Sequence, residues 1–310
     1  MAPPQALPWV TIVTPAYRQA EYLETCMRSV LDQDYPLLEY IVIDDGSPDD
    51  TLAVARAVAD AYPGRVQVLT QANAGQAATL NRGWSLARGE ILAYLSSDDL
   101  LCPGAVRTMV EALLAQPELG VAYCDCWLVD PNGRRVREHI AQAFDVRAMQ
   151  VDLVCHPGPA AFFRREVFET TGGWDVRRRQ VPDFEFWLRA SRRFQFARVP
   201  QRLAEYRIHE GSASFQAMSP ERADEIVEVV RGFWQGQESG ADVHASLARA
   251  FSIAAKNHAQ AGRPLLAMQR LGRALRLRPG LVLEPALWRQ LLVGFTRRLY
   301  YRCSAALRRS

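Results

Sequence analysis

The sequence predicts an α/β fold that is followed by a C-terminal helical region. Strand-like and helix-like patterns alternate along the first hundred residues, as they do in parallel α/β sheets. Acidic pairs follow two of the strand-like segments, at Asp44-Asp45 and at Asp98-Asp99. Beyond Ser219 the pattern is wholly helical, so we place a domain boundary near residue 216.

The elements of the α/β part can be assigned in order. The strands are short apolar runs rich in β-branched residues, and the helices carry apolar residues at spacings of three and four. Strands are predicted over Trp9–Thr14, Tyr40–Ile43, Val66–Leu69 and Ile91–Leu95, and helices over Glu21–Gln33, Asp50–Ala61 and Gln76–Ala87. Less regular sequence follows, with predicted strands over Val121–Val129, Ala160–Arg164 and Ala204–Ile208 and a predicted helix over Phe184–Arg193. Short right-handed crossovers are expected to set the first four strands side by side.

Composition is that of an ordinary soluble protein, with 49% hydrophobic and 23% charged residues in 310. The six cysteines are scattered and form no CxxC pair, which favours a reducing, cytoplasmic setting. The first residues lack the basic start and apolar core of a signal peptide, and no window has the length of a membrane-spanning helix.

Charge is distributed unevenly along the chain. The net charge is +3, yet the segment from Arg263 to the end holds eleven arginines and one acid, Glu284. A basic tail can bind anionic lipid, a polyanionic partner or nucleic acid, but the acidic remainder argues against a nucleic-acid enzyme. A helix predicted over residues 286–309 combines aromatic side chains with six arginines. It is either a peripheral membrane contact or a helix packed on the rest of the protein.

Asp98 and Asp99 are expected at the carboxyl end of a buried strand, where open α/β sheets bind their ligands. A nucleotide diphosphate repels carboxylates, so the two share a cleft only where a divalent cation bridges them. The implied cofactor is Mg²⁺ or Mn²⁺. The alternative is that one of these acids caps the helix that Pro103 and Gly104 begin.

Two further strand ends offer groups that can bind a nucleoside. Tyr17, which follows Thr14 and Pro15, presents a ring on which a base can stack, and Asp44 and Asp45 can accept hydrogen bonds from a base or a ribose. The alternative for the acids is an Asp-Gly turn that caps the next helix.

A third segment with small residues, Asn73–Gly83, lets backbone approach a ligand. Its Arg82 either reaches a base or phosphate or is a solvated helix residue. No GxGxxG motif and no phosphate-binding P-loop is present, which argues against hydride transfer and ATP hydrolysis.

Three later motifs complete the pattern: Gly172–Asp175, Pro182–Arg189 and Tyr206–Ser212. Together with the earlier motifs, in this order and spacing, they resemble the family 2 glycosyltransferases. These are inverting enzymes of the GT-A fold, a Rossmann-like fold for nucleotide-diphospho-sugar transfer. The resemblance implies a domain over 1–216, with a nucleotide-sugar half over about 8–99 and an acceptor half over 100–216. It does not cover the helical region, 217–310.

The resemblance also implies roles for individual residues. Those matching nucleotide-sugar-binding positions are Thr14, Pro15, Tyr17, Asp44, Asp45, Arg82, Ser97 and Asp98. Asp98 and His209 are the implied metal ligands. Ser96 replaces the first acid of the family's Asp-x-Asp motif, and Asp99 is then a supporting residue or a helix cap. Asp183 matches the general base, with a helix N-cap as its alternative, and Trp174 and Asp175 border the sugar or acceptor.

The implied reaction is metal-dependent transfer of a sugar, with inversion, from a UDP, dTDP or GDP sugar. The implied acceptor is a glycan, a lipid-linked or a protein acceptor in bacterial polysaccharide, glycolipid or glycoprotein assembly. The setting would be the cytoplasm, at the inner face of the cell membrane. One alternative is a non-catalytic nucleotide-sugar-binding or scaffold protein, which Ser96 permits. Another is a nucleotidyltransferase, which the lack of a glycine-rich basic loop after the first strand disfavours.

Overall fold

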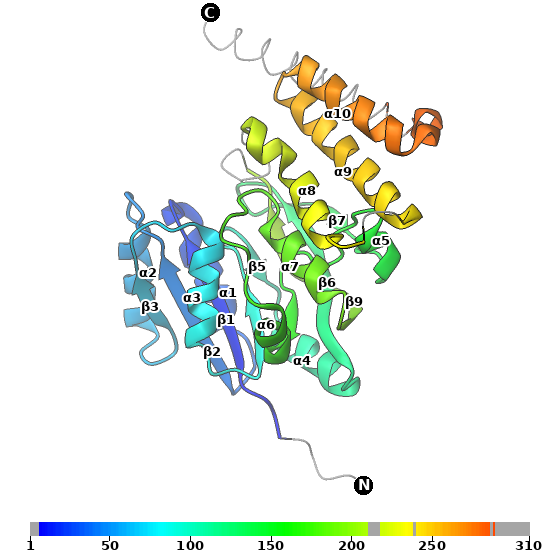
Figure 1. The fold of residues 1–310 in the computed structure, drawn as a ribbon. Helices are drawn as coiled ribbons and strands as arrows, with labels where there is room; N and C mark the ends of the chain where they lie inside the picture. Colours follow the sequence, from blue (N-terminus) through cyan, green and yellow to red (C-terminus); the bar gives the residue numbers. More distant parts are fainter. Residues whose placement is uncertain (1–5, 210–217, 238–239, 286–287, 289–310) are drawn as a thin grey trace, which may run out of the picture. The chain divides into compact units, whose positions relative to one another are not determined.

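The computed structural model describes residues 6–209, 218–237, 240–285 and 288 (Figure 1). The predicted boundary near residue 216 lies outside the described residues, as does almost all of the predicted basic helix over 286–309. The chain forms two compact units. The first takes the described parts of Met1–Phe144, Cys155–Arg177 and Pro182–His209, and the second takes those of Asp145–Val154, Arg178–Val181 and Glu210–Ser310.

The first unit is built on one sheet of nine strands. Its strands are β1 (Val10–Ala16), β2 (Leu38–Asp44), β3 (Gln67–Thr70), β4 (Ile91–Tyr94), β5 (Leu100–Leu101), β6 (Leu119–Val129), β7 (Arg135–His139), β8 (Phe162–Arg164) and β9 (Gln195–Arg207). The order in the sheet is β3-β2-β1-β4-β8-β6-β9-β5, with β7 paired to β6. The first four strands are parallel and adjacent, as the short crossovers predict.

Helices separate most of these strands and continue after the sheet is complete. They are α1 (Ala20–Leu31), α2 (Thr51–Ala61), α3 (Gln76–Leu86), α4 (Ala105–Ala115), α5 (Val146–Gln150), α6 (Arg165–Thr171), α7 (Pro182–Ala190), α8 (Pro220–Phe233), α9 (Ala241–Gln260) and α10 (Pro264–Leu277), followed by a 3₁₀ turn over Pro279–Leu283. Every strand and helix predicted for the first hundred residues is present. β9 is much longer than the strand predicted at its end, and β7 and α6 lie in segments for which we predicted no element.

The register of the sheet brings three strand ends to one edge. Ala16 at the end of β1 lies opposite Asp44 at the end of β2, and Val13 of β1 lies opposite Tyr94 at the end of β4. β9 pairs with β5, so its carboxyl end lies beside the segment that follows β4. Ligand-binding side chains at the carboxyl ends of these strands therefore share one edge of the sheet.

The core of the first unit is rich in aromatic rings. Trp84 of α3 is fully buried and contacts the rings of Phe163, Phe186, Trp174 and Tyr94 at centroid distances of 5.3, 6.0, 6.1 and 6.4 Å. The pair with Phe186 is stacked and the other three are edge-to-face, and both arrangements add stability beyond the burial of their area. This packing holds Tyr94, the last residue of β4, in place.

The second unit holds α5 and the helices α8, α9 and α10, and α9 lies between α8 and α10 (Figure 1). Asp224 of α8 accepts hydrogen bonds from Arg270 of α10 at 2.6 and 2.7 Å. It also lies 3.2 Å from Nε2 of the buried His258 in α9, whose Nδ1 accepts a hydrogen bond from Arg263. One polar network therefore joins the three helices. No helix in the described ranges combines the length and the low charge that crossing a membrane requires.

Candidate active site

The edge at the end of β4 brings the two predicted metal ligands together. Asp98 follows β4, and His209 lies two residues after the end of β9. Nε2 of His209 is 2.9 Å from Oδ2 of Asp98, although the two residues are 111 positions apart in the chain. The side chains of His209 and Asp98 are 10% and 17% exposed, so the pair is largely shielded from solvent but not completely buried.

The geometry of this pair fits a divalent cation. Two ligands bound at a right angle to an octahedral ion lie about 3 Å apart, which matches the separation of these two atoms. A carboxylate oxygen is the ligand type that Mg²⁺ and Mn²⁺ prefer, and an imidazole nitrogen is a common ligand of divalent transition metals. Among the residues that the structure describes, no group of three or more His, Cys, Asp or Glu side chains is gathered for a metal ion. A cation here would therefore take its remaining ligands from a bound diphosphate and water.

Asp99 has a different environment from Asp98. Its side chain is 3% exposed, and its Oδ1 accepts the backbone N–H of Arg207 at 2.9 Å. Burial and, second, the charge of Asp98 raise the pKa of Asp99 well above its usual value. Because Asp99 accepts the backbone N–H of Arg207, it ties the end of β9 to the segment that follows β4. Neither acid caps the following helix, because α4 begins after Gly104, whose conformation is left-handed.

Arg207 holds the loop that carries Asp98. Its guanidinium donates to the carbonyl oxygen of Asp98 at 2.9 Å and to those of Asp130 and Pro131 at 3.3 and 2.9 Å. The same group lies 4.8 Å from the ring centroid of Tyr22. That ring in turn lies 4.9 Å from the ring of His209. Arg207 and Tyr22 thus position both members of the Asp98–His209 pair.

The acids at the end of β2 organise the neighbouring loops. Asp44 accepts hydrogen bonds from the N–H of Ser47 at 3.2 Å and from the hydroxyl of Thr70 at 3.3 Å. Asp45 accepts the N–H groups of Ala74 and Gly75 at 2.9 and 2.7 Å. Gly75 is the N-cap of α3, so Asp45 holds the loop before α3 rather than capping the next helix, α2.

Arg82 continues the same network. Its guanidinium donates to the backbone carbonyl of Thr70 at 3.1 Å and to Oε1 of Gln71 at 2.9 Å. The amide of Gln71 donates in turn to Oδ1 of Asp45 at 2.7 Å. Arg82 is therefore linked to Asp45 through one side chain, and its predicted contact with a nucleotide stays a prediction.

The predicted base-stacking segment ends β1. The hydroxyl of the fully buried Thr14 pairs with that of Tyr40 at 3.0 Å, and Pro15 is buried next to it. Tyr17, by contrast, is 41% exposed. Tyr17 follows the last residue of β1, and the guanidinium of Arg18 lies 5.4 Å from the centroid of its ring. Its predicted contact with a base stays a prediction. Ser97, which lies before Asp98, is buried, with 5% of its side chain exposed.

Asp183 lies in the first turn of α7, one residue after Pro182 begins the helix, and it is not the N-cap. A helix N-terminus stabilises a carboxylate. Burial and, second, the charge of Asp183 raise the pKa of Tyr94 well above its usual value. The carboxylate of Asp183 therefore lies within electrostatic range of Tyr94, the last residue of β4.

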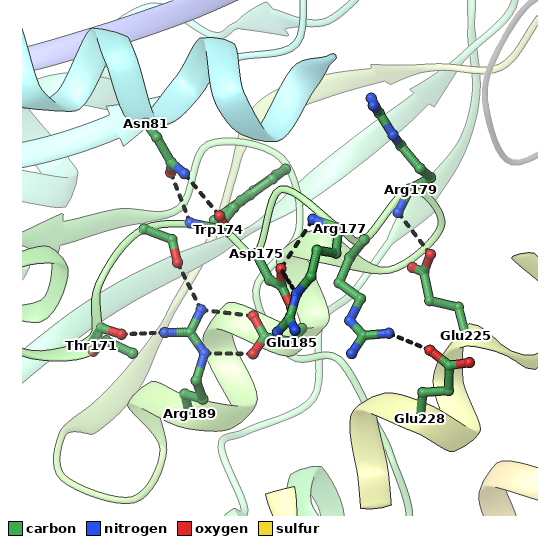
Figure 2. Close-up of polar contacts among 12 residues, drawn as sticks. Asn81, Thr171, Trp174, Asp175, Arg177, Arg179, Glu185, Arg189, Glu225 and Glu228 are labelled. Carbon is green, nitrogen blue, oxygen red and sulfur yellow. Dashed lines mark hydrogen bonds and ion pairs between the residues drawn. The ribbon is translucent and has the colours of Figure 1, made fainter. Parts of the chain in front are cut away.

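Trp174 and Asp175 lie close to this edge but have internal partners (Figure 2). The ring of Trp174 is 3% exposed and packs edge-to-face on Tyr94 at 5.1 Å. Asn81 of α3 holds its backbone on both sides, with hydrogen bonds of 2.8 Å to its N–H and to its carbonyl. Asp175 binds the backbone N–H and the guanidinium of Arg177. The predicted contact of Trp174 and Asp175 with sugar stays a prediction.

Sequence reasoning did not single out Arg207, Gln71 and Asn81, which position the predicted residues. Arg207 lies within the Tyr206–Ser212 motif, so its place in that motif was a signal that could have identified it. Gln71 and Asn81 lie in segments with many polar residues, where nothing marks one as a partner. Their hydrogen bonds depend on the register of the sheet.

The sequence matches the family described as glycosyl transferase family 2 over residues 11–172, just over half of the chain. It is 35% identical over 125 residues to the uncharacterized glycosyltransferase YibD of Escherichia coli (strain K12), a match that covers 40% of this chain and 36% of YibD. It is 26% identical over 224 residues to the chondroitin synthase of Pasteurella multocida (strain Pm70), with 72% of this chain and 23% of that protein covered. The chain thus spans roughly a quarter to a third of the length of these relatives.

Two solved structures share the fold. TarS 1–349 of S. aureus in complex with UDP superposes with a TM-score of 0.62 at 17% identity, covering 88% of this chain and 90% of that chain. The mannosyltransferase PcManGT of Pyrobaculum calidifontis in complex with GDP-Man and Mn²⁺ gives a TM-score of 0.59 at 21% identity, covering 96% and 88%. The α/β unit therefore has the predicted GT-A fold. With the family match over residues 11–172, the chain belongs to glycosyl transferase family 2.

Proposed function

We propose that this protein transfers a sugar from a nucleotide-diphosphate sugar to an acceptor hydroxyl, with inversion and with a divalent cation. The observation that carries this proposal is the Asp98–His209 pair at 2.9 Å. The pair follows β4, the strand whose last residue, Tyr94, lies within range of the charge of Asp183. A cation-binding pair beside a carboxylate base is what such a transfer requires. The Mn²⁺ and GDP-Man bound by PcManGT and the UDP bound by TarS support the same assignment.

The donor site that we propose lies at the carboxyl ends of β1 and β2. Tyr17 stacks on the base, because its ring is accessible there. Asp44 and Asp45 hold the loops around the ribose. Three donors occupy Asp45, two on Oδ1 and one on Oδ2, so its Oδ2 can still accept one hydrogen bond from a ligand. UDP, dTDP and GDP are the candidate nucleotides.

In the reaction, Asp183 takes the proton from the acceptor hydroxyl as the hydroxyl oxygen attacks the anomeric carbon. The bond between that carbon and the diphosphate breaks on the opposite face, so the configuration inverts. Asp98 and His209 would hold the cation, which when bound offsets the charge that develops on the leaving diphosphate. Arg207 and Asp99 keep the Asp98 loop in place during this step.

For the acceptor, we propose a hydroxyl of a bacterial polysaccharide, glycolipid or glycoprotein. The similarity to a chondroitin synthase supports polysaccharide assembly over the other two settings. A lipid-linked acceptor would require work at the inner face of the cell membrane, with the basic segment over 286–309 as the contact. Removal of residues 285–310 should then abolish binding to anionic lipid vesicles, and unchanged binding would exclude that contact.

The first test is calorimetry with UDP, GDP, dTDP and CMP and their sugars, with Mn²⁺ and with a chelator. We expect one diphosphate series to bind, and only with the cation. Asp98→Ala should lose the metal-dependent binding of the donor, whereas Asp183→Asn should bind the donor normally and lose transfer. Metal-independent binding would contradict the cation site, and normal transfer by Asp183→Asn would contradict the base. Donor binding with no transfer to any acceptor would favour the non-catalytic alternative, which Ser96 permits.

A further inference from the structure

One buried carboxylate holds the segment that leads into Asp183. Glu225 of α8 is 6% exposed. Its Oε2 accepts the backbone N–H of Arg179 at 2.8 Å (Figure 2). Its Oε1 accepts the backbone N–H groups of Gln180 and Val181, each also at 2.8 Å. Three consecutive amides thus point at one side chain. Hydrogen bonds to an ionised acceptor are about twice as strong as those between neutral groups.

The place of these amides in the chain gives them a consequence for the site. Val181 is followed directly by Pro182, the first residue of α7, and then by Asp183. Proline has a fixed φ, so the direction in which α7 begins depends on the backbone just before it. On the other side of the segment, Asp175 binds the backbone N–H of Arg177 at 3.0 Å. The chain between Asp175 and Asp183 is therefore held at both ends by carboxylates.

A second glutamate of the same helix shows how unusual this contact is. Glu228 lies one turn after Glu225 and forms an ion pair of 2.7 Å with the side chain of Arg178. Its side chain is 63% exposed, and the described contact is with a side chain rather than with backbone amides. Exposed pairs of this kind contribute little to stability. Glu228 is therefore a matched control for Glu225 in charge, helix and neighbouring segment.

We propose that Glu225 is a positioning residue for the transfer reaction: it fixes the backbone of residues 179–181 and through it the placement of Asp183. This inference rests on the proposed function of Asp183 as the base. It predicts that loss of the Glu225 carboxylate slows the chemical step and leaves the donor site intact. A displacement of a reacting group by about 1 Å is enough to cost about 100-fold in rate.

The experiment compares Glu225→Gln with Glu228→Gln in the full chain. Glutamine has the shape of glutamate, but its NH₂ group is a donor and would face the backbone N–H donors without accepting a hydrogen bond from them. We expect Glu225→Gln to lower kcat about 10- to 100-fold, with donor affinity by calorimetry within a factor of about two. Glu228→Gln should match the wild type in both. Should Glu225→Gln not fold, Glu225→Asp, which draws the carboxylate back by one methylene, is measured in its place with the same expected direction.

Two readouts separate positioning from a general loss of structure. In an Asp183→Asn background, Glu225→Gln should cause no further loss of the residual rate, because the base it positions is already absent. Hydrogen exchange of a peptide covering residues 176–188 should be faster in Glu225→Gln and unchanged in Glu228→Gln. A kcat of Glu225→Gln equal to that of the wild type overturns the proposal, as does an equal loss of donor binding and transfer.

Failure of the proposed function gives a different result. If the wild type transfers no sugar from any donor, the assignment of Asp183 is wrong, and the exchange measurement still decides the contact. Faster exchange of residues 176–188 in Glu225→Gln then supports the control of this segment by Glu225, and unchanged exchange overturns it.

Discussion

Asp45 shows how a single acid at a strand end can organise a loop instead of capping its own turn. Both of its oxygens accept hydrogen bonds from the segment before α3, two from backbone amides and one from Gln71. Its side chain is 3% exposed, so these bonds form away from water. An acid with this role fixes the loops at the end of β2, where we propose that the nucleotide binds.

We expect Asp45→Asn to destabilise the protein by about 1–3 kcal/mol, because an NH₂ group would then face N–H donors in a buried site. Denaturant unfolding measures the change. Asp50→Asn is the control: Asp50 is the exposed N-cap of α2 and makes no side-chain capping bond, so its change should stay within about 0.5 kcal/mol. Equal effects of the two substitutions would contradict the role given to Asp45.

At the scale of elements, the first hundred residues were predictable because local pattern and tertiary structure agree there. Each strand is a buried apolar run and each helix has one apolar face. The acids at the ends of β2 and β4 could be placed for the same reason. Their partners could not, since the contact of Asp98 with His209 depends on the pairing of β9 with β5 and β6.

Later elements were harder to predict. All five residues of β7 are exposed, so no alternation of apolar and polar residues marks this strand, and only its pairing with β6 defines it. Asn132 and Gly133, in the turn before β7, were a usable hairpin signal. β9 contains Pro200 and the exposed polar residues Gln195, Gln201 and Arg202, which hide its pattern until β6 is present to pair with it.

The network that joins α8, α9 and α10 makes the stability of these helices depend on pH. Burial lowers the pKa of His258 from its usual 6.5, and Arg263 and Arg270 also lower it, while Asp224 opposes them. The folded state therefore holds fewer protons at this site than the unfolded state. The stability that neutral His258 contributes is complete above pH 6.5 and is lost as the pH falls below it.

We expect the free energy of unfolding, measured with denaturant, to decrease when the pH is lowered from 7.5 to 5.5. The decrease should be smaller in His258→Gln than in the wild type. The difference cannot exceed about 1.4 kcal/mol for each pH unit. His244→Gln is the control, because His244 is an exposed residue of the same helix, and it should follow the wild type. Identical curves for wild type and His258→Gln would remove His258 as the cause.

At the scale of the whole molecule, the two units are not consecutive in the chain. Residues Asp145–Val154 and Arg178–Val181 lie within the catalytic sequence but belong to the unit of α8, α9 and α10. The family match ends at residue 172, before the second of these segments. A cut at the end of the matched region or at residue 209 would therefore not separate two complete units.

We expect a chain ending at residue 209 to be cleaved by trypsin at Arg178 and Arg179 much faster than the full chain. Proteolysis requires locally unfolded backbone, and the truncation removes Glu225, which holds the amides of 179–181. A chain ending at residue 285 retains Glu225 and serves as the control, with cleavage at the rate of the full chain. Equal rates in all three chains would show that α8 does not protect this segment.

The interleaving of the two units also sets an order in time. A ribosome releases residues 178–181 about 45 residues before Glu225 leaves the exit tunnel, so during synthesis the segment before Asp183 waits for its partner. The GT-A sheet can form as soon as β9 is complete, but Asp183, the base that we propose, gains the support that we propose from Glu225 only when α8 has been made. We therefore expect a nascent chain to bind its donor before it gains the ability to transfer the sugar.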